Sequence, residues 1–304
     1  MINILQKFLK EKYGIEIQLT PLLGGADANA TLYKGVGDTN DYFIKVKNQF
    51  DPHSLLSIAH LLQNAGIKEI IYPVKALNGS YFENLENKIV LVYPFIDGED
   101  GFHKNLTLEQ WTLLGMSLKK IHEILVPASL GIRRESFSDK WRKQVSRLLN
   151  KENFFPKYKK TIQKLLDNAE ILSKKVDLSS PFVLCHADIH GGNVLIDNHN
   201  GIYIVDWDDP ILAPKERDLM FVGGGVGNVW NKTNQEEAFF RGYGKESINS
   251  LLIAYYRHER ILEDVVEYYH LLKDSPNDPE FNKQFNAQFD SNGVVDIAFK
   301  SFDI

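Results

Sequence analysis

The chain has 304 residues, of which 43% are hydrophobic and 25% are charged, as in an ordinary globular protein rather than a disordered one. Its net charge of −5 and isoelectric point near 6.0 argue against nonspecific nucleic-acid binding and favour a cationic small molecule as the partner. No apolar run reaches the roughly 18 residues of a membrane span, the amino terminus lacks a signal-peptide pattern, and the single cysteine fits a reducing compartment. We therefore expect a cytoplasmic protein.

The first 95 residues are predicted to form a helix followed by five strands. Apolar side chains at Ile4, Leu5, Phe8 and Leu9 recur at helical spacing, and Gly14 follows as a C-cap. Strands are predicted at 16–23, 28–36, 41–46, 70–77 and 88–95, and a further helix at 54–64.

The turn between the first two predicted strands contains Gly24 and Gly25. Its backbone N–H groups are candidates to bind nucleotide phosphates, because consecutive amides in a turn form an anion-binding concavity. The segment lacks the pattern G-x-G-x-x-G, so an ordinary hairpin turn is an equal alternative.

From residue 106 onward the periodicity is mostly helical. Thr107 can cap the first helix of this part, and His122 near its end is expected to be packed rather than catalytic. Helices are also predicted at 137–149, 158–175, 235–243 and 248–272, with a short one in the closing AFKSF. The order of elements predicts an α+β fold of two lobes, an antiparallel sheet lobe at 1–95 and a larger, mainly helical lobe at 96–304.

Three short apolar runs within the second part, at 182–185, 194–196 and 202–205, are predicted to be buried strands. Polar side chains follow their ends. Asp188 and Asn193 are five residues apart on one loop, as in the kinase pattern H-x-D-x-x-x-x-N, where Asp receives a hydroxyl proton and Asn holds Mg²⁺. Asp206 ends the next strand, where that pattern has its second metal ligand. The chemistry that fits these spacings is phosphoryl transfer.

A zinc or iron site is an alternative for the HADIH segment, since His and Asp are suitable ligands for both metals. The other histidines are scattered along the chain, and Asn193 is a poor zinc ligand, so this alternative is the weaker one. Cys185 is adjacent to His186 on a strand, and adjacent strand residues point to opposite faces, which excludes a Cys–His nucleophile pair.

The segments HADIHGGNVLID and IYIVDWDD resemble the aminoglycoside phosphotransferase and choline kinase group, whose fold is similar to that of protein kinases. The continuation PILAPKERDLMFVGGGVGNVWNKT resembles, more narrowly, the spectinomycin phosphotransferases within that group. The resemblance extends from about residue 45 to about residue 232 and is most specific in the catalytic loop.

The resemblance implies ATP and Mg²⁺ as cofactors and gives a role to Lys45, the lysine of the third strand, at the α- and β-phosphates. It also implies a helix whose Glu pairs with this lysine. The helix predicted at 54–64 contains no acidic residue, and His60 lies near the expected position. The partner of Lys45 therefore stays open.

The resemblance also places the hinge between the lobes at the end of the fifth strand, where backbone groups bind adenine. Pro94 has no N–H, so Phe95 or Ile96 is the expected donor, with the carbonyl of Tyr93 as acceptor. An edge strand ended by Pro and Gly is an equal alternative.

Several acidic residues are candidates to bind the substrate or to support the loop. Asp208 and Asp209 could hold a substrate ammonium or tune the metal, whereas Asp218 is expected to brace the catalytic loop. Glu263 and Glu267 belong to an acidic stripe, begun by Glu259, on the last long helix. That stripe could bind a cationic aminocyclitol, although a solvated helix face is the more common explanation.

Three functions remain in competition. The first is an ATP- and Mg²⁺-dependent O-phosphotransferase acting on an aminocyclitol or aminoglycoside such as spectinomycin, as antibiotic resistance would require. The second is a metabolic kinase for choline, homoserine or a methylthioribose-like sugar, because function follows the site and not the fold. The third is a nucleotide-binding module without catalysis, suggested by the missing partner of Lys45.

Overall fold

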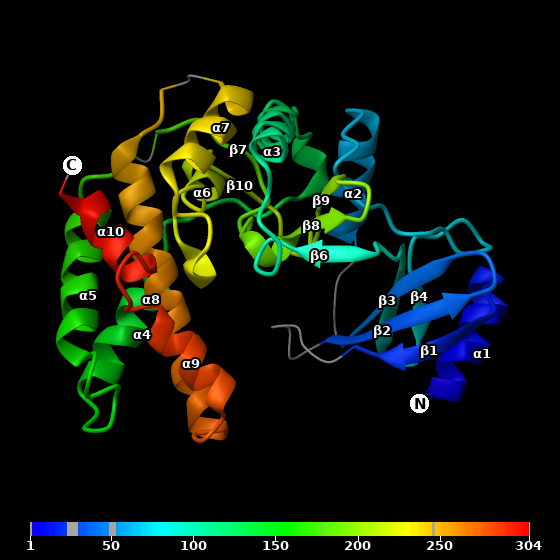
Figure 1. Ribbon diagram of the computed structural model, residues 1–304, viewed down its shortest axis with the longest axis horizontal. Helices are drawn as coiled ribbons and strands as arrows, with labels where there is room; N and C mark the ends of the chain where they lie inside the picture. Colours follow the sequence, from blue (N-terminus) through cyan, green and yellow to red (C-terminus); the bar gives the residue numbers. More distant parts are fainter. Residues whose placement is uncertain (1, 23–29, 49–52, 178, 245–246, 304) are drawn as a thin grey trace. The chain divides into compact units, whose positions relative to one another are not determined.

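The computed structural model describes residues 2–22, 30–48, 53–177, 179–244 and 247–303, with the side chains of 53–55 left out. The chain forms two compact units (Figure 1). The first comprises residues 1–99, 128–131 and 195–209, and the second comprises 100–127, 132–194 and 210–304. The lobe boundary predicted after residue 95 lies close to the first junction, but the segment 195–209 belongs to the first unit rather than the second.

The first unit is built on a five-stranded antiparallel sheet whose order is β1-β2-β3-β5-β4. Its strands are β1 (Ile17–Pro21), β2 (Ala30–Gly37), β3 (Asp41–Asn48), β4 (Glu83–Leu85) and β5 (Lys88–Pro94). Helix α1 (Ile2–Tyr13) packs on the sheet through Leu5, Phe8 and Leu9, and Gly14 ends it in the left-handed conformation that glycine adopts without strain. Ile4, predicted to share the apolar face, is 58% exposed.

The strand predicted at 70–77 does not form, and this prediction is wrong. Only Ile70 makes a bridge, to Ile204, and Val74 donates one hydrogen bond to the carbonyl of Val92. Pro73 has no N–H to offer to a ladder, which disfavours a continuous strand through this segment. The fourth sheet strand is instead β4, after the turn at Gly79.

Helix α2 (His53–Asn64) and most of a small sheet of order β6-β8-β9 belong to the first unit. The strands of the small sheet are β6 (Gly98–Asp100), β8 (Val194–Asp197) and β9 (Ile202–Ile204). The bridge between Ile70 and Ile204, with the hydrogen bond from the Ile204 N–H to the Glu69 carbonyl, ties β9 to the segment after α2. These contacts explain why residues 195–209 join a unit that is otherwise made from the amino-terminal third.

The second unit is mainly helical, as predicted. Its elements are α3 (Leu108–His122), α4 (Lys140–Leu149), α5 (Lys159–Ser173), α6 (Glu216–Leu219), α7 (Thr233–Tyr243), α8 (Ser250–Asp274), α9 (Pro279–Ala287) and α10 (Val294–Phe302), with the strand pair β7 (Val183–Cys185) and β10 (Ile211–Ala213). Short 3₁₀ turns of this unit lie at Gly191–Asn193 and Val226–Asn228, whereas the 3₁₀ turn at Ala128–Leu130 belongs to the first unit. Helix α9 and strands β6 and β10 were not predicted.

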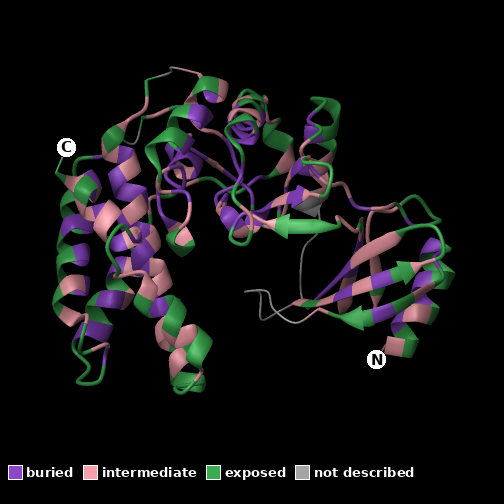
Figure 2. Cartoon of the chain, in the orientation of Figure 1, coloured by how far each residue is buried: buried purple, intermediate pink, exposed green. Residues whose placement is uncertain are grey.

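Helix α8 is the central element of the second unit. It packs against α4, α5 and α10 around a core that includes Phe154, Leu165, Leu262 and Val265. Figure 2 shows that buried residues run along α8, whereas α9 is covered mostly by exposed and intermediate residues. Helix α8 is thus held on several sides by the other helices of this unit.

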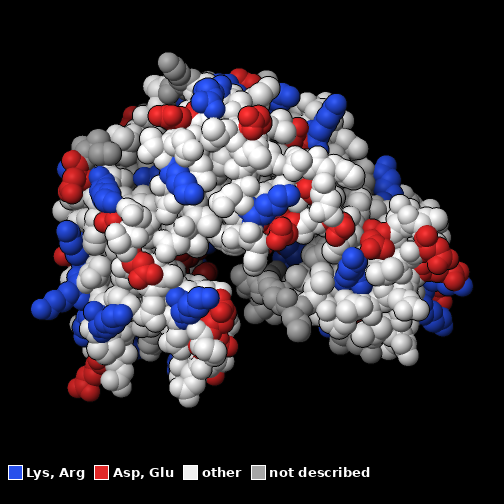
Figure 3. All heavy atoms as spheres, in the orientation of Figure 1, with Lys and Arg blue, Asp and Glu red and all other residues white. Residues whose placement is uncertain are grey.

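On the face shown in Figure 3, basic and acidic side chains are interspersed. None of the helices among the described residues combines the length and the apolar character that crossing a membrane requires. The α+β class, with an antiparallel amino-terminal sheet followed by a helical part, is the predicted one.

Candidate active site

The loop between β7 and β8 carries Asp188 and has a strained backbone. Ala187 has φ of 72°, a left-handed conformation that costs a residue with a Cβ free energy. The buried carboxylate of Asp218, just after β10 in α6, accepts the N–H of Ala187 at 2.7 Å and the N–H of His186 at 2.9 Å. The brace expected of Asp218 is thus present as two hydrogen bonds to the loop backbone.

Asp218 is itself held by His122 of α3. Its Oδ2 lies 3.1 Å from His122 Nε2, and His122 Nδ1 lies 2.7 Å from the hydroxyl of Tyr243. Burial opposes the charged form of Asp218, but the hydrogen bond and charge of His122 outweigh it and lower the pKa of that carboxyl. His122 is packed, as predicted, and Cys185 beside this network is fully buried.

Asp188 and Asn193 are brought together on the loop. The Asn193 amide nitrogen donates to the Asp188 carbonyl at 2.8 Å and lies 3.4 Å from Asp188 Oδ2. Because the NH₂ group is used in this way, the amide oxygen of Asn193 is turned away from Asp188 and is a suitable ligand for a hard cation. His190 caps the following turn through the N–H of Gly192, and its Nε2 lies 3.5 Å from Asp188 Oδ2.

A residue that the sequence did not reveal, Arg260 of α8, forms the shortest contact with Asp188. Its Nη1 lies 2.6 Å from Asp188 Oδ1, and its Nε lies 2.8 Å from Asp264 Oδ1. Burial disfavours the ionised form of Asp188, but Arg260 and then His190 outweigh that effect and hold the pKa of this carboxyl well below its usual range. Asp188 is therefore a carboxylate at neutral pH, and its side chain is 42% exposed.

In the first unit, Lys45 of β3 has two acidic partners. Its Nζ lies 2.8 Å from Asp206 Oδ1 and 2.6 Å from Asp208 Oδ2, and Lys47 shares Asp208. Burial would lower the pKa of Lys45, but the two carboxylates together raise it, so the ammonium stays charged. Asp208 is 15% exposed and Asp206 is 44% exposed. Among the described residues these carboxylates take the place of the helix Glu whose absence left the partner of Lys45 open.

Asp206 follows β9 in a left-handed conformation, with φ of 66°. Such strain in a residue with a side chain is concentrated at functional sites, where it aims a group that regular structure would point elsewhere. Asp209 is exposed. Asp188 and Asn193 belong to the second unit and Asp206 to the first, so the convergence of Asn193 and Asp206 on one cation remains a prediction.

The hinge prediction can be compared with the register of β5. The Phe95 N–H donates to the carbonyl of Asp41 at 3.0 Å, so Phe95 already uses its donor within the sheet. Since hydrogen-bonded pairs alternate along antiparallel strands, Tyr93, paired with Phe43, also turns its backbone groups toward β3. The carbonyl of Pro94 then points away from β3. Ile96 is the next residue whose N–H points away from β3 as well.

The acidic stripe on α8 divides into residues with different environments. Glu259 is buried and lies 3.0 Å from Arg142, so it is part of the core. Glu263 is half-buried and Glu267 is exposed. Although the residue is exposed, partial desolvation of its carboxylate by the surrounding protein, and then the carboxylates of Asp264 and Glu263, raise the pKa of Glu267 to about 7. Gly24 and Gly25 lie outside the described residues.

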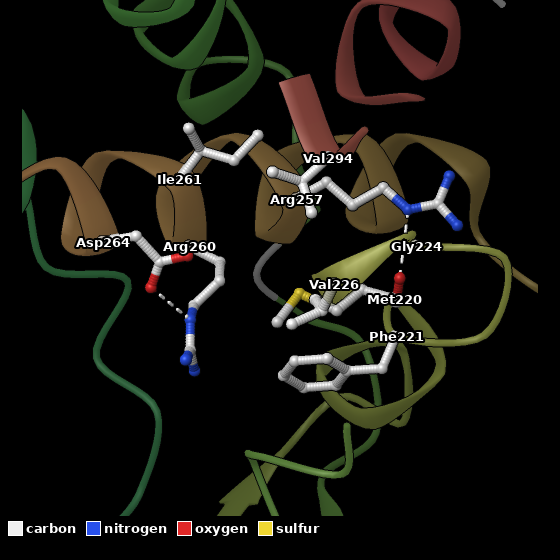
Figure 4. A pocket seen from close by; sticks show the side chains of 9 residues that line it. All are labelled: Met220, Phe221, Gly224, Val226, Arg257, Arg260, Ile261, Asp264 and Val294. Atoms are coloured by element: carbon white, nitrogen blue, oxygen red, sulfur yellow. Dashed lines mark hydrogen bonds and ion pairs between the residues drawn. The ribbon is translucent and has the colours of Figure 1, made fainter. Parts of the chain in front are cut away.

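A small pocket lies beside Arg260, between α8 and the segment after α6 (Figure 4). Phe221 and Met220 form its apolar side, and Val294 of α10 closes it. Arg257, one turn before Arg260, leaves α8 in a different direction and donates to the carbonyls of Met220 and Val222. Of the two arginines, Arg260 is the one that contacts Asp188.

The match of this chain to known proteins agrees with the geometry. The model of the family described as "Phosphotransferase enzyme family" matches residues 18–257. A solved spectinomycin phosphotransferase, APH(9)-Ia in complex with ADP and spectinomycin, is 43% identical, with 100% of this chain and 99% of that chain covered and a TM-score of 0.94. An AMP-bound complex of the same enzyme is 42% identical, with 98% of each chain covered and a TM-score of 0.88.

Choline kinase LicA from Streptococcus pneumoniae shares the fold at 17% identity, with 99% of this chain and 98% of that chain covered and a TM-score of 0.62. Among curated proteins, no sequence matches this chain significantly. With most of its length matched by the family model and a relative of 43% identity aligned from end to end, the chain belongs to the phosphotransferase enzyme family.

Proposed function

We propose that this protein transfers the γ-phosphoryl group of ATP to a hydroxyl of a cationic aminocyclitol of the spectinomycin type. The observation that carries the proposal is the partly exposed carboxylate of Asp188, fixed on a strained loop by Asp218 and by Arg260. The chemistry of the relatives of more than 40% identity, which are spectinomycin phosphotransferases bound to nucleotides, supports the choice of substrate. We place the protein in the cytoplasm, where ATP is available as the phosphoryl donor.

In this proposal Asp188 orients the substrate hydroxyl by accepting its hydrogen bond and takes its proton as the oxygen–phosphorus bond forms. A carboxylate of low pKa is a weak base, so its main contribution is orientation rather than early proton removal. That division of labour suits phosphoryl transfer, whose loose transition state needs positioning and charge neutralisation more than it needs a strong nucleophile.

On the nucleotide side, Lys45 is proposed to contact the α- and β-phosphates of ATP. The sequence assigned Asp208 to the substrate, but its contacts with Lys45 and Lys47 favour a role in holding the nucleotide-binding lysine in place. The strand register favours the carbonyl of Pro94 and the N–H of Ile96 for the adenine edge, in place of Tyr93 and Phe95.

Mg²⁺ suits the oxygen donors that Asp206 and Asn193 offer, and we propose that these two residues hold it. Carboxylate and amide oxygens are the ligands preferred by this hard cation, and neither residue is a soft ligand of the kind that zinc favours. When bound, the ion neutralises charge on the β- and γ-phosphates. Glu263 and Glu267 on α8, with Asp209, remain proposed contacts for the substrate ammonium groups.

The test is transfer of label from [γ-³²P]ATP to spectinomycin, aminoglycosides, choline and homoserine. We expect spectinomycin to be labelled, and Asp188→Asn to lower kcat by roughly 10²–10⁴-fold with little change in ATP affinity. The control is Asp139→Asn, which makes the same substitution at an exposed position and should leave kcat unchanged. Label only on choline or homoserine would identify a metabolic kinase, and Mg-ATP binding without any transfer would identify a nucleotide-binding module.

A further inference from the structure

Arg260 contacts Asp188, although no sequence pattern indicated that the two residues would meet. It lies on α8, far along the chain from the catalytic loop, yet its guanidinium contacts the carboxylate of Asp188 at 2.6 Å. The arginine side chain is 21% exposed, and a partly desolvated guanidinium needs carboxylate partners.

The contact geometry shows how Arg260 is held. Its Nε is engaged by Asp264, one helical turn later on α8, at 2.8 Å, which leaves Nη1 directed at Asp188. A planar guanidinium with two of its edges fixed cannot rotate freely, so it transmits the rigidity of α8 to the loop. The helix in turn is fixed by its packing against α4, α5 and α10.

We propose that Arg260 is a positioning residue for phosphoryl transfer, which fixes the Asp188 carboxylate in the orientation that receives the substrate hydroxyl, and that Asp264 keeps Arg260 in place. This inference rests on the proposed phosphotransfer at Asp188. Arg260 holds the Asp188 Oδ1 atom, while Asn193 and His190 lie near Oδ2. The carboxylate is therefore restrained from both of its oxygens.

Arginine differs from lysine at such a position, because only the fork of the guanidinium can engage two carboxylates at fixed angles. Arg260→Ala is expected to lower kcat about 10²-fold, the size of effect produced by misplacing a reacting group by about 1 Å. Arg260→Lys keeps the charge but not the fork, so we expect a loss of roughly tenfold. The KM for ATP should change less than about twofold in both, since binding of the nucleotide does not use this contact.

Chemical rescue separates positioning from a general structural role. Guanidinium ion added to Arg260→Ala should restore kcat several-fold, and it should not restore Asp188→Asn. Asp264→Asn should give an intermediate loss that guanidinium does not rescue, because Arg260 still occupies the site. Arg147→Ala, which removes an exposed arginine from α4 of the same unit, is the matched control and should keep its activity.

Each variant is assayed both for transfer to spectinomycin and for slow transfer of phosphate to water, and the crystal structure of Arg260→Ala is compared with the parent. If the parent does not phosphorylate spectinomycin, the proposed substrate is wrong, while the water reaction still tests Arg260. Any one of four results for Arg260→Ala would overturn the inference. These are a kcat within twofold of the parent, a change in KM alone, no rescue by guanidinium, and an Asp188 carboxylate that keeps its orientation.

Discussion

At the scale of single residues, the site depends on buried charges that hold a strained loop. Asp218 illustrates this, because its carboxylate has three partners: two backbone N–H groups and an imidazole. All three donors belong to buried residues. The stability of the loop is thus linked to the stability of the fold through one side chain.

Replacing Asp218 by Asn should destabilise the protein by about 3–5 kcal/mol, because in either orientation the amide would place its NH₂ group against a buried backbone N–H, that of Ala187 or that of His186. The pKa of Asp218 is lowered, so the folded state binds fewer protons than the unfolded state below the ordinary value of 3.8. The stabilisation is therefore present above that pH and is lost as the pH falls. Urea unfolding at several pH values should show the difference from Asn shrinking in acid.

Glu267 gives a second prediction at this scale. Its pKa is raised to about 7, so the carboxylate gains its charge as the pH rises from 6 to 8. If Glu267 contacts the substrate, the Kd for spectinomycin should tighten over that range by roughly two- to fivefold more than in Glu267→Gln, as expected for an exposed ion pair. Titration of the antibiotic itself affects both proteins equally. Parallel curves for the two would remove Glu267 from the substrate site.

At the scale of elements, the approach of α3 and α7 places constraints on two glycines. Gly115 of α3 and Gly242 of α7 each lie against the backbone of the other helix, where a Cβ would collide with the carbonyl oxygen of Phe239 or of Thr112. The Thr112 hydroxyl also donates across the contact to the carbonyl of Ala238. Close packing here fixes His122, which lies at the end of α3 and supports Asp218.

Gly115→Ala should lower the free energy of unfolding by about 1–3 kcal/mol, because the added methyl group separates the helices. This would occur although alanine favours an isolated helix over glycine by about 1 kcal/mol. Ser146→Ala, at an exposed position of α4, is the control and should change stability by less than about 0.5 kcal/mol. A Gly115→Ala protein as stable as its parent in urea would contradict the packing argument.

At the scale of the whole molecule, each compact unit contains part of the proposed machinery. The first holds Lys45 with Asp206 and Asp208, and the second holds Asp188 with Asn193 and Arg260. Segment 195–209, which comes late in the chain, joins the amino-terminal sheet. Ligands that need residues from both units should therefore stabilise the entire chain.

Mg²⁺ with ADP should raise the melting temperature more than either alone, because the proposed site holds the ion and the nucleotide together. A ligand at one hundred times its Kd contributes about 2.7 kcal/mol of stability. Differential scanning fluorimetry with ADP, Mg²⁺ and both would measure this. Asp206→Asn should lose the part that depends on Mg²⁺ and keep a smaller response to ADP alone. Equal shifts with and without Mg²⁺ in the parent would argue against the assigned ligands.

The class of the fold, the strands around Lys45 and the loop that carries Asp188 and Asn193 could be predicted from the sequence, because these features depend on local periodicity and on short spacings. The family followed from the resemblance of its motifs to those of known phosphotransferases. The sequence also correctly anticipated the buried states of His122 and Cys185. The strand predicted at 70–77 does not form. That prediction gave the hydrophobic pattern more weight than Pro73, which has no N–H to pair.

Which distant side chains meet depends on how the elements pack, and the sequence pattern did not reveal it. Nothing near Arg260 in the sequence marks it as a partner of Asp188, and an acid two residues after Asp206 gave no sign that it would pair with Lys45 and Lys47. The use of the Phe95 N–H within the sheet depended on strand register. Long-range pairings of charges and hydrogen bonds arise from how elements pack, and a local pattern carries no information about them.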